Sequence, residues 1–162
     1  MKIKKQITGF TLIDLMVAMV VIGIGLAITI PTMRDFTNAN RQTEQINRFV
    51  RDLTYAKTEA VTRGRTITLT SLTGPIWSGG WNITDGDTGD VLRTTSAFTI
   101  PGLTLTSTGG VGVLNFRPDG SIAGAFNADL CTADTDLVSR DKQVSVSVTG
   151  RVALNAQFAG CP

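Results

Sequence analysis

The chain has 162 residues, with 15 basic and 13 acidic side chains, two cysteines and no histidine. This length allows one modest domain beside an N-terminal segment and excludes a multidomain enzyme. Without histidine, the chain cannot assemble Ser-His-Asp or Cys-His catalytic groups or histidine-based zinc sites. Residues 66–162 carry five basic groups against eight Asp, a net charge of −3, which is unlike the basic surface of a dedicated nucleic-acid-binding protein.

The N-terminal part contains a candidate transmembrane helix. Residues 10–30 read FTLIDLMVAMVVIGIGLAITI, in which Asp14 is the only charged side chain. At ~1.5 Å per residue, a helix of this length spans the ~30 Å hydrocarbon layer of a bilayer. Because Lys2, Lys4 and Lys5 precede the segment, the positive-inside rule predicts a cytoplasmic N-terminus and an extracytoplasmic remainder.

The flanks of the apolar segment indicate which end is processed. A secretory signal has a small-residue cleavage site after its apolar region, and the sequence PTMRDF that follows Ile30 offers none. We therefore expect the apolar segment to remain in the protein. The basic leader of residues 1–9 ends in Gly9 and is followed by Phe10-Thr11-Leu12-Ile13-Asp14. This arrangement resembles the class III leader of type IV pilins and type II secretion pseudopilins.

The resemblance implies roles for three residues. A prepilin peptidase, which is also an N-methyltransferase, would cut between Gly9 and Phe10 and methylate the new amine of Phe10. Asp14 would pair with the Phe10 amine of a neighbouring subunit and align helices in a filament. A carboxylate inside the apolar layer costs roughly 2.5 to 3.5 kcal/mol on insertion scales and normally has a partner. The family usually has Glu at this position, one methylene longer, and the alternative is that Asp14 is hydrated near the cytoplasmic interface.

Residues 31–64 predict an amphipathic stalk helix, because apolar side chains recur at spacings of three and four. The expected packing face consists of Phe36, Ile46, Phe49, Val50, Leu53, Ala56, Ala60 and Val61. The expected solvent face carries Arg41, Glu44, Arg48, Arg51, Asp52, Lys57 and Glu59. Gly64 is the natural C-cap. The segment from Leu53 to Gly64 resembles the stretch that GspH/FimT-type minor pilins carry where helix meets sheet, which indicates a minor subunit.

Residues 65–162 predict a β-rich extracytoplasmic domain. Short alternating runs occupy residues 66–72, 81–84, 91–95, 103–107, 113–116 and 143–154, with Gly, Pro and Asp clusters between them. This pattern indicates an antiparallel sheet. The family resemblance implies an α+β protein with the type IV pilin fold, in which a long N-terminal helix, first transmembrane and then amphipathic, packs on a small antiparallel sheet domain.

The stretch from Asp85 to Asp90 is the strongest candidate for a metal site. Its closely spaced aspartates offer oxygen ligands of the kind that calcium prefers, but it lacks the spacing and final Glu of an EF-hand loop. Asp and Gly are also favoured in turns for their own backbone reasons. We therefore predict a hairpin turn with solvated acids and no metal.

Cys131 and Cys161 are the only thiols, and they lie in the segment placed outside the cytoplasm. An oxidising compartment favours their pairing. We predict a disulfide that holds the C-terminal tail against the last part of the sheet and stabilises the fold by roughly 3 to 4 kcal/mol. The alternative is two free buried thiols.

Gly150 and Arg151 match part of a Gly-Arg-x-Arg tail motif that is associated with DNA binding in some FimT-like proteins. Ala153 stands where the second Arg would be, and the surrounding domain is acidic. The charge available to neutralise phosphates is therefore small. The favoured interpretation is a glycine turn between two strand segments with an exposed arginine.

The sequence therefore predicts a structural subunit, with no catalytic function and no cofactor. We expect a minor pilin or pseudopilin that is incorporated into a type IV pilus or a type II secretion pseudopilus and primes its assembly. Its partners would be prepilin peptidase and other minor and major pilins or pseudopilins. It would cross the bacterial inner membrane once, with its C-terminal domain in the periplasm. The alternative is a FimT-like minor pilin that binds DNA for uptake in natural transformation.

Overall fold

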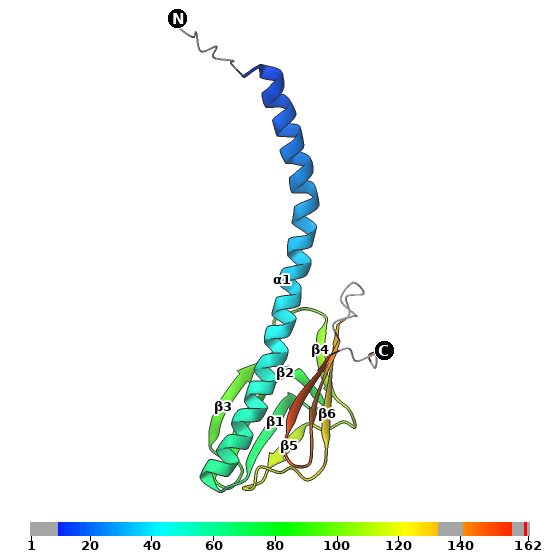
Figure 1. Cartoon of the computed structure of the whole chain (residues 1–162). Coiled ribbons are helices and arrows are strands. Elements are labelled where there is room, and N and C mark those ends of the chain that lie inside the picture. The colour runs from blue at the N-terminus through cyan, green and yellow to red at the C-terminus, as the bar shows by residue number, and fades with distance from the viewer. Residues whose placement is uncertain (1–9, 133–140, 157–160, 162) are drawn as a thin grey trace, which may run out of the picture. The chain divides into compact units, whose positions relative to one another are not determined.

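The computed structural model of the chain describes residues 10–132, 141–156 and 161, except for the side chains of residues 27–36, 38 and 156. Its described part consists of one helix followed by eight strands (Figure 1). The chain divides into two units, Met1–Asn38 and Ala39–Pro162. Helix α1 (Leu12–Arg63) extends across this boundary, so the two helical segments predicted before and after Pro31 form one helix.

The described part of the first unit is helical and has an apolar surface. Its large apolar side chains are more than half exposed: Leu12, Ile13, Leu15, Met16, Val17, Met19, Val20, Val21, Ile22, Ile24 and Leu26. Because these positions include consecutive residues of a helix with about 3.6 residues per turn, the apolar surface surrounds α1. Within the described residues, no helix is long and apolar enough to cross a membrane. Residues 27–30 of the predicted span lie outside the described side chains.

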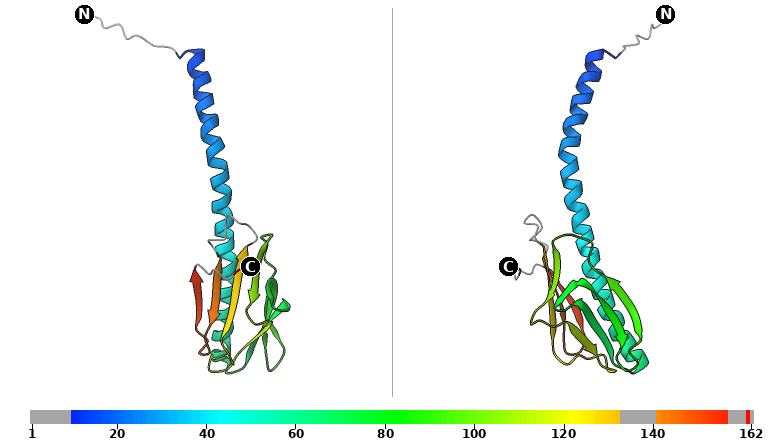
Figure 2. Two further views of the ribbon diagram at one scale, coloured as in Figure 1. Left: turned by 90° about the vertical axis from the view of Figure 1, so that its right-hand side faces the viewer. Right: turned by 180° about the vertical axis from the view of Figure 1, so that it is seen from behind.

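In the second unit, α1 packs one face against the sheet. Ile46, Phe49, Leu53, Ala56 and Ala60 are fully buried, and their spacing of three or four residues places them on one side of the helix. The last turns of α1 lie against the strands in both views of Figure 2.

The helix ends at the predicted C-cap. Gly64 adopts a left-handed φ of 63°, which glycine accepts without steric cost. The N–H of Arg65 donates to the carbonyl of Ala60 at 3.2 Å, the long hydrogen bond of a Schellman motif. The chain can then reverse direction into the first strand.

The strands of the second unit are all paired antiparallel. They are β1 (Ile67–Thr73), β2 (Ile76–Asp85), β3 (Val91–Ser96), β4 (Leu103–Ser107), β5 (Val113–Phe116), β6 (Phe126–Thr132), β7 (Lys142–Val146) and β8 (Val152–Ala156). Their order is β5-β1-β2-β4-β6-β7-β8, and β3 also pairs with β2. Ile76, at the start of β2, pairs with Thr106 of β4, whereas Gly80–Thr84 pair with β3. One edge of β2 therefore pairs with β1, and its other edge is divided between β3 and β4.

Aromatic side chains join the helix to strands β2 and β6. The ring centroid of Phe49 lies 5.4 Å from that of Trp77, 5.0 Å from that of Trp81 and 6.4 Å from that of Phe126. Buried aromatic rings contribute large apolar areas and favour such tilted or edge-to-face contacts. The indole N–H of Trp77 donates to the carbonyl of Val111 at 3.0 Å, so its polar group is satisfied. One helical residue thus contacts β2 and β6 at the same time.

The predicted α+β arrangement is confirmed, and the local differences have physical reasons. A strand, β6, forms at residues 126–132, where the sequence pattern predicts none. The alternating run predicted at 143–154 forms two strands, β7 and β8, and the predicted glycine turn joins them. Val61 was assigned to the packing face, but it is 53% exposed, because it follows the buried Ala60 by about 100° around the helix. Asp52, expected in solvent, is only 3% exposed.

Candidate assembly site

Of the residues predicted to carry assembly, Asp14 lies in the first turn of α1 and Phe10 lies just before the helix. Gly9 and the rest of the leader lie outside the described residues, and Phe10 is 93% exposed. The Asp14 carboxylate accepts hydrogen bonds from the backbone N–H and the hydroxyl of Thr11, at 3.1 and 2.8 Å. The N–H of Asp14 donates to Thr11 Oγ1 at 3.3 Å, which completes a capping box. Asp14 therefore has a partner in its own chain, and its pairing with the Phe10 amine of a neighbour stays a prediction.

Asp52 is a buried anchor between α1 and the sheet. Its carboxylate accepts from Trp81 Nε1 at 3.0 Å, from Thr95 Oγ1 at 2.7 Å and from Arg93 Nη1 at 2.7 Å. The Arg93 guanidinium also lies 4.2 Å from the centre of the Tyr55 ring, a cation–π contact. A buried carboxylate is tolerated when its charge is paired and its oxygens accept hydrogen bonds, as they do here.

The sequence contains a signal for this burial that a simple charged-face interpretation misses. Asp52 follows Phe49 by three residues and precedes Ala56 by four, so it lies beside the packing face. The charge alone suggests solvent exposure. The three donors that compensate for its burial come from β2 and β3, and the helical pattern cannot place them.

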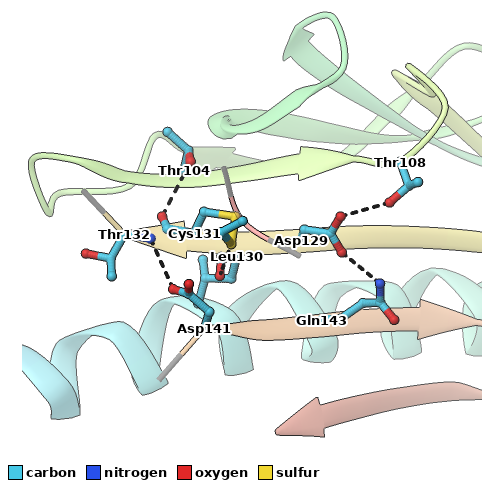
Figure 3. The surroundings of a disulfide bond; sticks show 9 residues. Thr104, Thr108, Asp129, Leu130, Cys131, Thr132, Asp141 and Gln143 are labelled. Atoms are coloured by element: carbon cyan, nitrogen blue, oxygen red, sulfur yellow. Dashed lines mark hydrogen bonds between the residues drawn. A yellow bond between two sulfur atoms is a disulfide. The ribbon is translucent and has the colours of Figure 1, made fainter. Parts of the chain in front are cut away.

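The C-terminal end is joined to β6 by the predicted disulfide, whose surroundings are shown in Figure 3. Cys131 and Cys161 are 30 positions apart in sequence, and their Cα atoms are 5.6 Å apart. Two residues before Cys131, the carboxylate of Asp129 accepts from Thr108 Oγ1 at 2.9 Å and from Gln143 Nε2 at 2.8 Å. The disulfide therefore closes a loop that contains β7 and β8, next to a polar cross-strand network.

The acid-rich segment between β2 and β3 forms the predicted hairpin turn, but the prediction that all its acids are solvated is wrong. Asp85 is buried, and its carboxylate accepts the N–H groups of Asp87 and Thr88 at 3.0 and 3.3 Å. These backbone donors, foremost that of Asp87, lower the pKa of Asp85, and the nearby Arg65 guanidinium acts in the same direction. In the part of the chain that the structure describes, no three Cys, Asp or Glu side chains are grouped as a metal site.

Arg151 lies in the turn between β7 and β8. Gly150 has a left-handed φ of 70°, and its N–H donates to the carbonyl of Ser147 at 2.7 Å. The side chain of Arg151 is exposed, and Ala153 follows in β8. The interpretation as a glycine turn with an exposed arginine is thus confirmed, whereas the DNA contact of Arg151 stays a prediction.

Two known sequence families match the parts of the chain that contain most of these features. Residues 4–30 match the prokaryotic N-terminal methylation motif. Residues 45–150 match the family described as Type II transport protein GspH.

The chain belongs to the GspH family. The matched GspH region contains Asp52, both tryptophans and the turn at Gly150, whereas Cys161 lies beyond it. No curated protein matches the chain.

Solved structures agree with membership in the GspH family. The type IV minor pilin FimU of Pseudomonas aeruginosa is 26% identical, with a TM-score of 0.65 over 74% of this chain and 92% of that one. The minor pseudopilin EpsH from the type 2 secretion system of Vibrio cholerae is 16% identical, with a TM-score of 0.55 over 72% of this chain and 97% of that one. The likeness to EpsH shows a shared fold. Together these comparisons confirm the predicted GspH/FimT-type group and the type IV pilin fold.

Proposed function

We propose that this chain is a minor pilin or pseudopilin, a structural subunit that acts by association with other subunits rather than by catalysis. The observation that carries the proposal is the apolar surface around the first unit of α1, which coincides with the N-terminal methylation motif at residues 4–30. A helix that is apolar on all sides needs lipid or other helices around it. The inner membrane supplies the lipid before assembly, and the α1 helices of other subunits supply the contacts in the filament.

Processing at the leader prepares the chain for assembly. Prepilin peptidase cuts between Gly9 and Phe10, and the new Phe10 amine is methylated and keeps its positive charge. Asp14 then lies in the first helical turn, where its negative charge also complements the positive end of the helix dipole. Pairing between Asp14 and the Phe10 amine of a neighbour neutralises both groups inside the apolar layer.

The proposed topology is a single pass through the bacterial inner membrane. The leader, which contains Lys2, Lys4 and Lys5, stays in the cytoplasm, and the sheet domain lies in the periplasm. The disulfide between Cys131 and Cys161 supports this placement, because disulfides persist in oxidising compartments.

The likeness to FimU supports a type IV pilus. This type IV minor pilin is 26% identical, with a TM-score of 0.65 over 92% of its chain, whereas the matched family is described as Type II transport protein GspH. We therefore propose a type IV pilus as the assembly in which this subunit functions.

The test of the proposed function is expression with and without a prepilin peptidase. We expect the N-terminus to begin at methylated Phe10 only when the peptidase is present, and a Gly9→Leu variant to keep its leader in both strains. Mass spectrometry of the purified chain reads both outcomes. An unchanged N-terminus of the unaltered chain in both strains would remove this function.

A further inference from the structure

A polar hollow of about 420 Å³ lies between the second-unit part of α1 and strand β3. The helix lines it with Glu44, Arg48, Arg51 and Asp52, and β3 lines it with Arg93, Thr94 and Thr95. Three arginines from two elements thus face one concave surface.

Two of the three arginines are held in place. Arg93 is fixed by its hydrogen bond to Asp52 and by the Tyr55 ring beneath its guanidinium. Arg48 Nη2 donates to Ser96 Oγ at 3.3 Å, which directs its side chain toward β3. The Arg51 side chain is exposed and makes no hydrogen bond or ion pair with the described residues. The hollow is therefore partly preorganised and retains unused guanidinium donors.

The charged side chains of the hollow that are not already paired carry a net positive charge. The Asp52 carboxylate is buried beneath it and already accepts hydrogen bonds from Trp81, Thr95 and Arg93. Arg48 and Arg51 remain, with Glu44 as the one exposed acid among the lining residues. The planar guanidinium group matches a carboxylate through two parallel N–H donors. A single acidic side chain from a partner would therefore neutralise the remaining positive charge.

We infer that the hollow binds an acidic loop of an adjacent subunit in the filament, with Arg48 and Arg51 as the contacts for its carboxylate. This inference rests on the proposed function, because it requires a neighbouring subunit. Subunits of this kind do expose acids, since Asp87 and Asp90 of this chain are exposed at the tip of the β2–β3 turn. A nucleic acid fits less well, because Glu44 faces the same surface and residues 39–162, which form the second unit, carry 11 basic and 11 acidic side chains and therefore no excess of positive charge.

The experiment places a photoreactive p-benzoylphenylalanine at Thr94, which is exposed and lines the hollow, in the full chain in piliated cells. The same group at Val17, in the first unit, serves as the control for assembly. We expect the Thr94 probe to cross-link to a pilin-type subunit, and the attached peptide to contain Asp or Glu when it is identified by mass spectrometry.

Charge reversal then tests the arginines. Arg51→Glu places like charges together and should lower the Thr94 cross-linking yield by about tenfold or more. Arg151→Glu makes the same charge change at the distant β7–β8 turn and should leave the yield unchanged. Exchanging the mapped acid of the partner for Lys should restore cross-linking to the Arg51→Glu chain.

The outcomes separate this inference from the proposed function. Cross-linking of pilin-type subunits at Val17 but not at Thr94 overturns the acidic-loop site and leaves the proposed function intact. The acidic-loop site is also overturned if the attached peptide contains no acid, or if the Thr94 probe forms a nucleic-acid or lipid adduct. Equal effects of Arg51→Glu and Arg151→Glu overturn it as well. Absence of subunit adducts at both positions contradicts the proposed function and the site together.

Discussion

The two units of this chain differ in how far their apolar side chains are exposed. Around the first unit, side chains such as Val17 and Ile22 are more than half exposed, whereas in the second unit Phe49 and Leu53 are fully buried between α1 and the sheet. Burial of apolar surface is the main driving force of folding, so the second unit carries its own stabilisation. The first unit needs lipid or other helices to gain the same free energy. Helix α1 thus has an exposed apolar surface in the first unit and a buried apolar face in the second.

Truncation of one apolar side chain in each unit gives the largest contrast. Phe49→Ala should lower the free energy of unfolding by about 4 kcal/mol, because it opens a cavity between Trp77, Trp81 and Phe126. Val17→Ala should change it by less than about 0.5 kcal/mol, because the Val17 side chain is 58% exposed. Urea unfolding of the full chain in detergent, followed by tryptophan fluorescence, measures both. Equal losses would show that the two units do not differ in this way.

Removal of the disulfide should have the next largest effect. The double variant Cys131→Ser and Cys161→Ser opens a loop with a sequence separation of 30 residues, which should cost roughly 3 to 4 kcal/mol. Because the loop lies in the second unit, association of the first unit with membranes should be unchanged. Urea unfolding with and without a reductant measures the loss, and a reductant that leaves the parent chain equally stable would contradict the prediction.

The buried anchor tests whether α1 and the sheet are held together by more than apolar contacts. Asp52→Asn keeps the shape but removes the charge that Arg93 and two neutral donors satisfy. We expect a loss of about 2 kcal/mol, less than for a fully buried pair because the Arg93 side chain is 45% exposed. Glu44→Gln, an exposed acid on the same helix, is the matched control and should have little effect. A loss at Glu44 equal to that at Asp52 would argue against a specific anchor.

The smallest expected effect is on the acid dependence of stability. The folded pKa of Asp85 is lowered, so its stabilising contribution is complete above the ordinary Asp pKa of about 3.9 and is lost as the pH falls through the folded value. Unfolding midpoints should be level near pH 6 and fall below about pH 4. Asp85→Asn should reduce this fall, whereas Asp87→Asn, at an exposed position on the same turn, should leave it unchanged. Identical pH profiles for all three chains would refute this assignment.

The parts of the fold that local patterns determine could be predicted from the sequence. The helical spacing of Ile46, Phe49, Leu53, Ala56 and Ala60 predicts the packing face, and the glycine at 64 predicts the helix end. The pairing of the two cysteines follows from their number and the expected compartment.

The parts that depend on distant neighbours could not be predicted. Strand β6 contains Asn127, Ala128 and Asp129, residues that disfavour strands, and it forms because β4 and β7 pair with its two edges. Asp52 was assigned to solvent because its charge is visible in the sequence, whereas Trp81, Arg93 and Thr95 are brought to it only by the fold. The arginine-lined hollow has the same origin, since α1 and β3 are far apart in the chain.

The most direct test of the central claim is the intact mass of this subunit in pili sheared from cells. The account predicts a chain that begins at methylated Phe10, keeps the whole apolar part of α1 and has the disulfide between Cys131 and Cys161 closed. A chain whose first residue lies beyond Pro31 would contradict the account, because the segment proposed to associate with lipid and other helices would be missing.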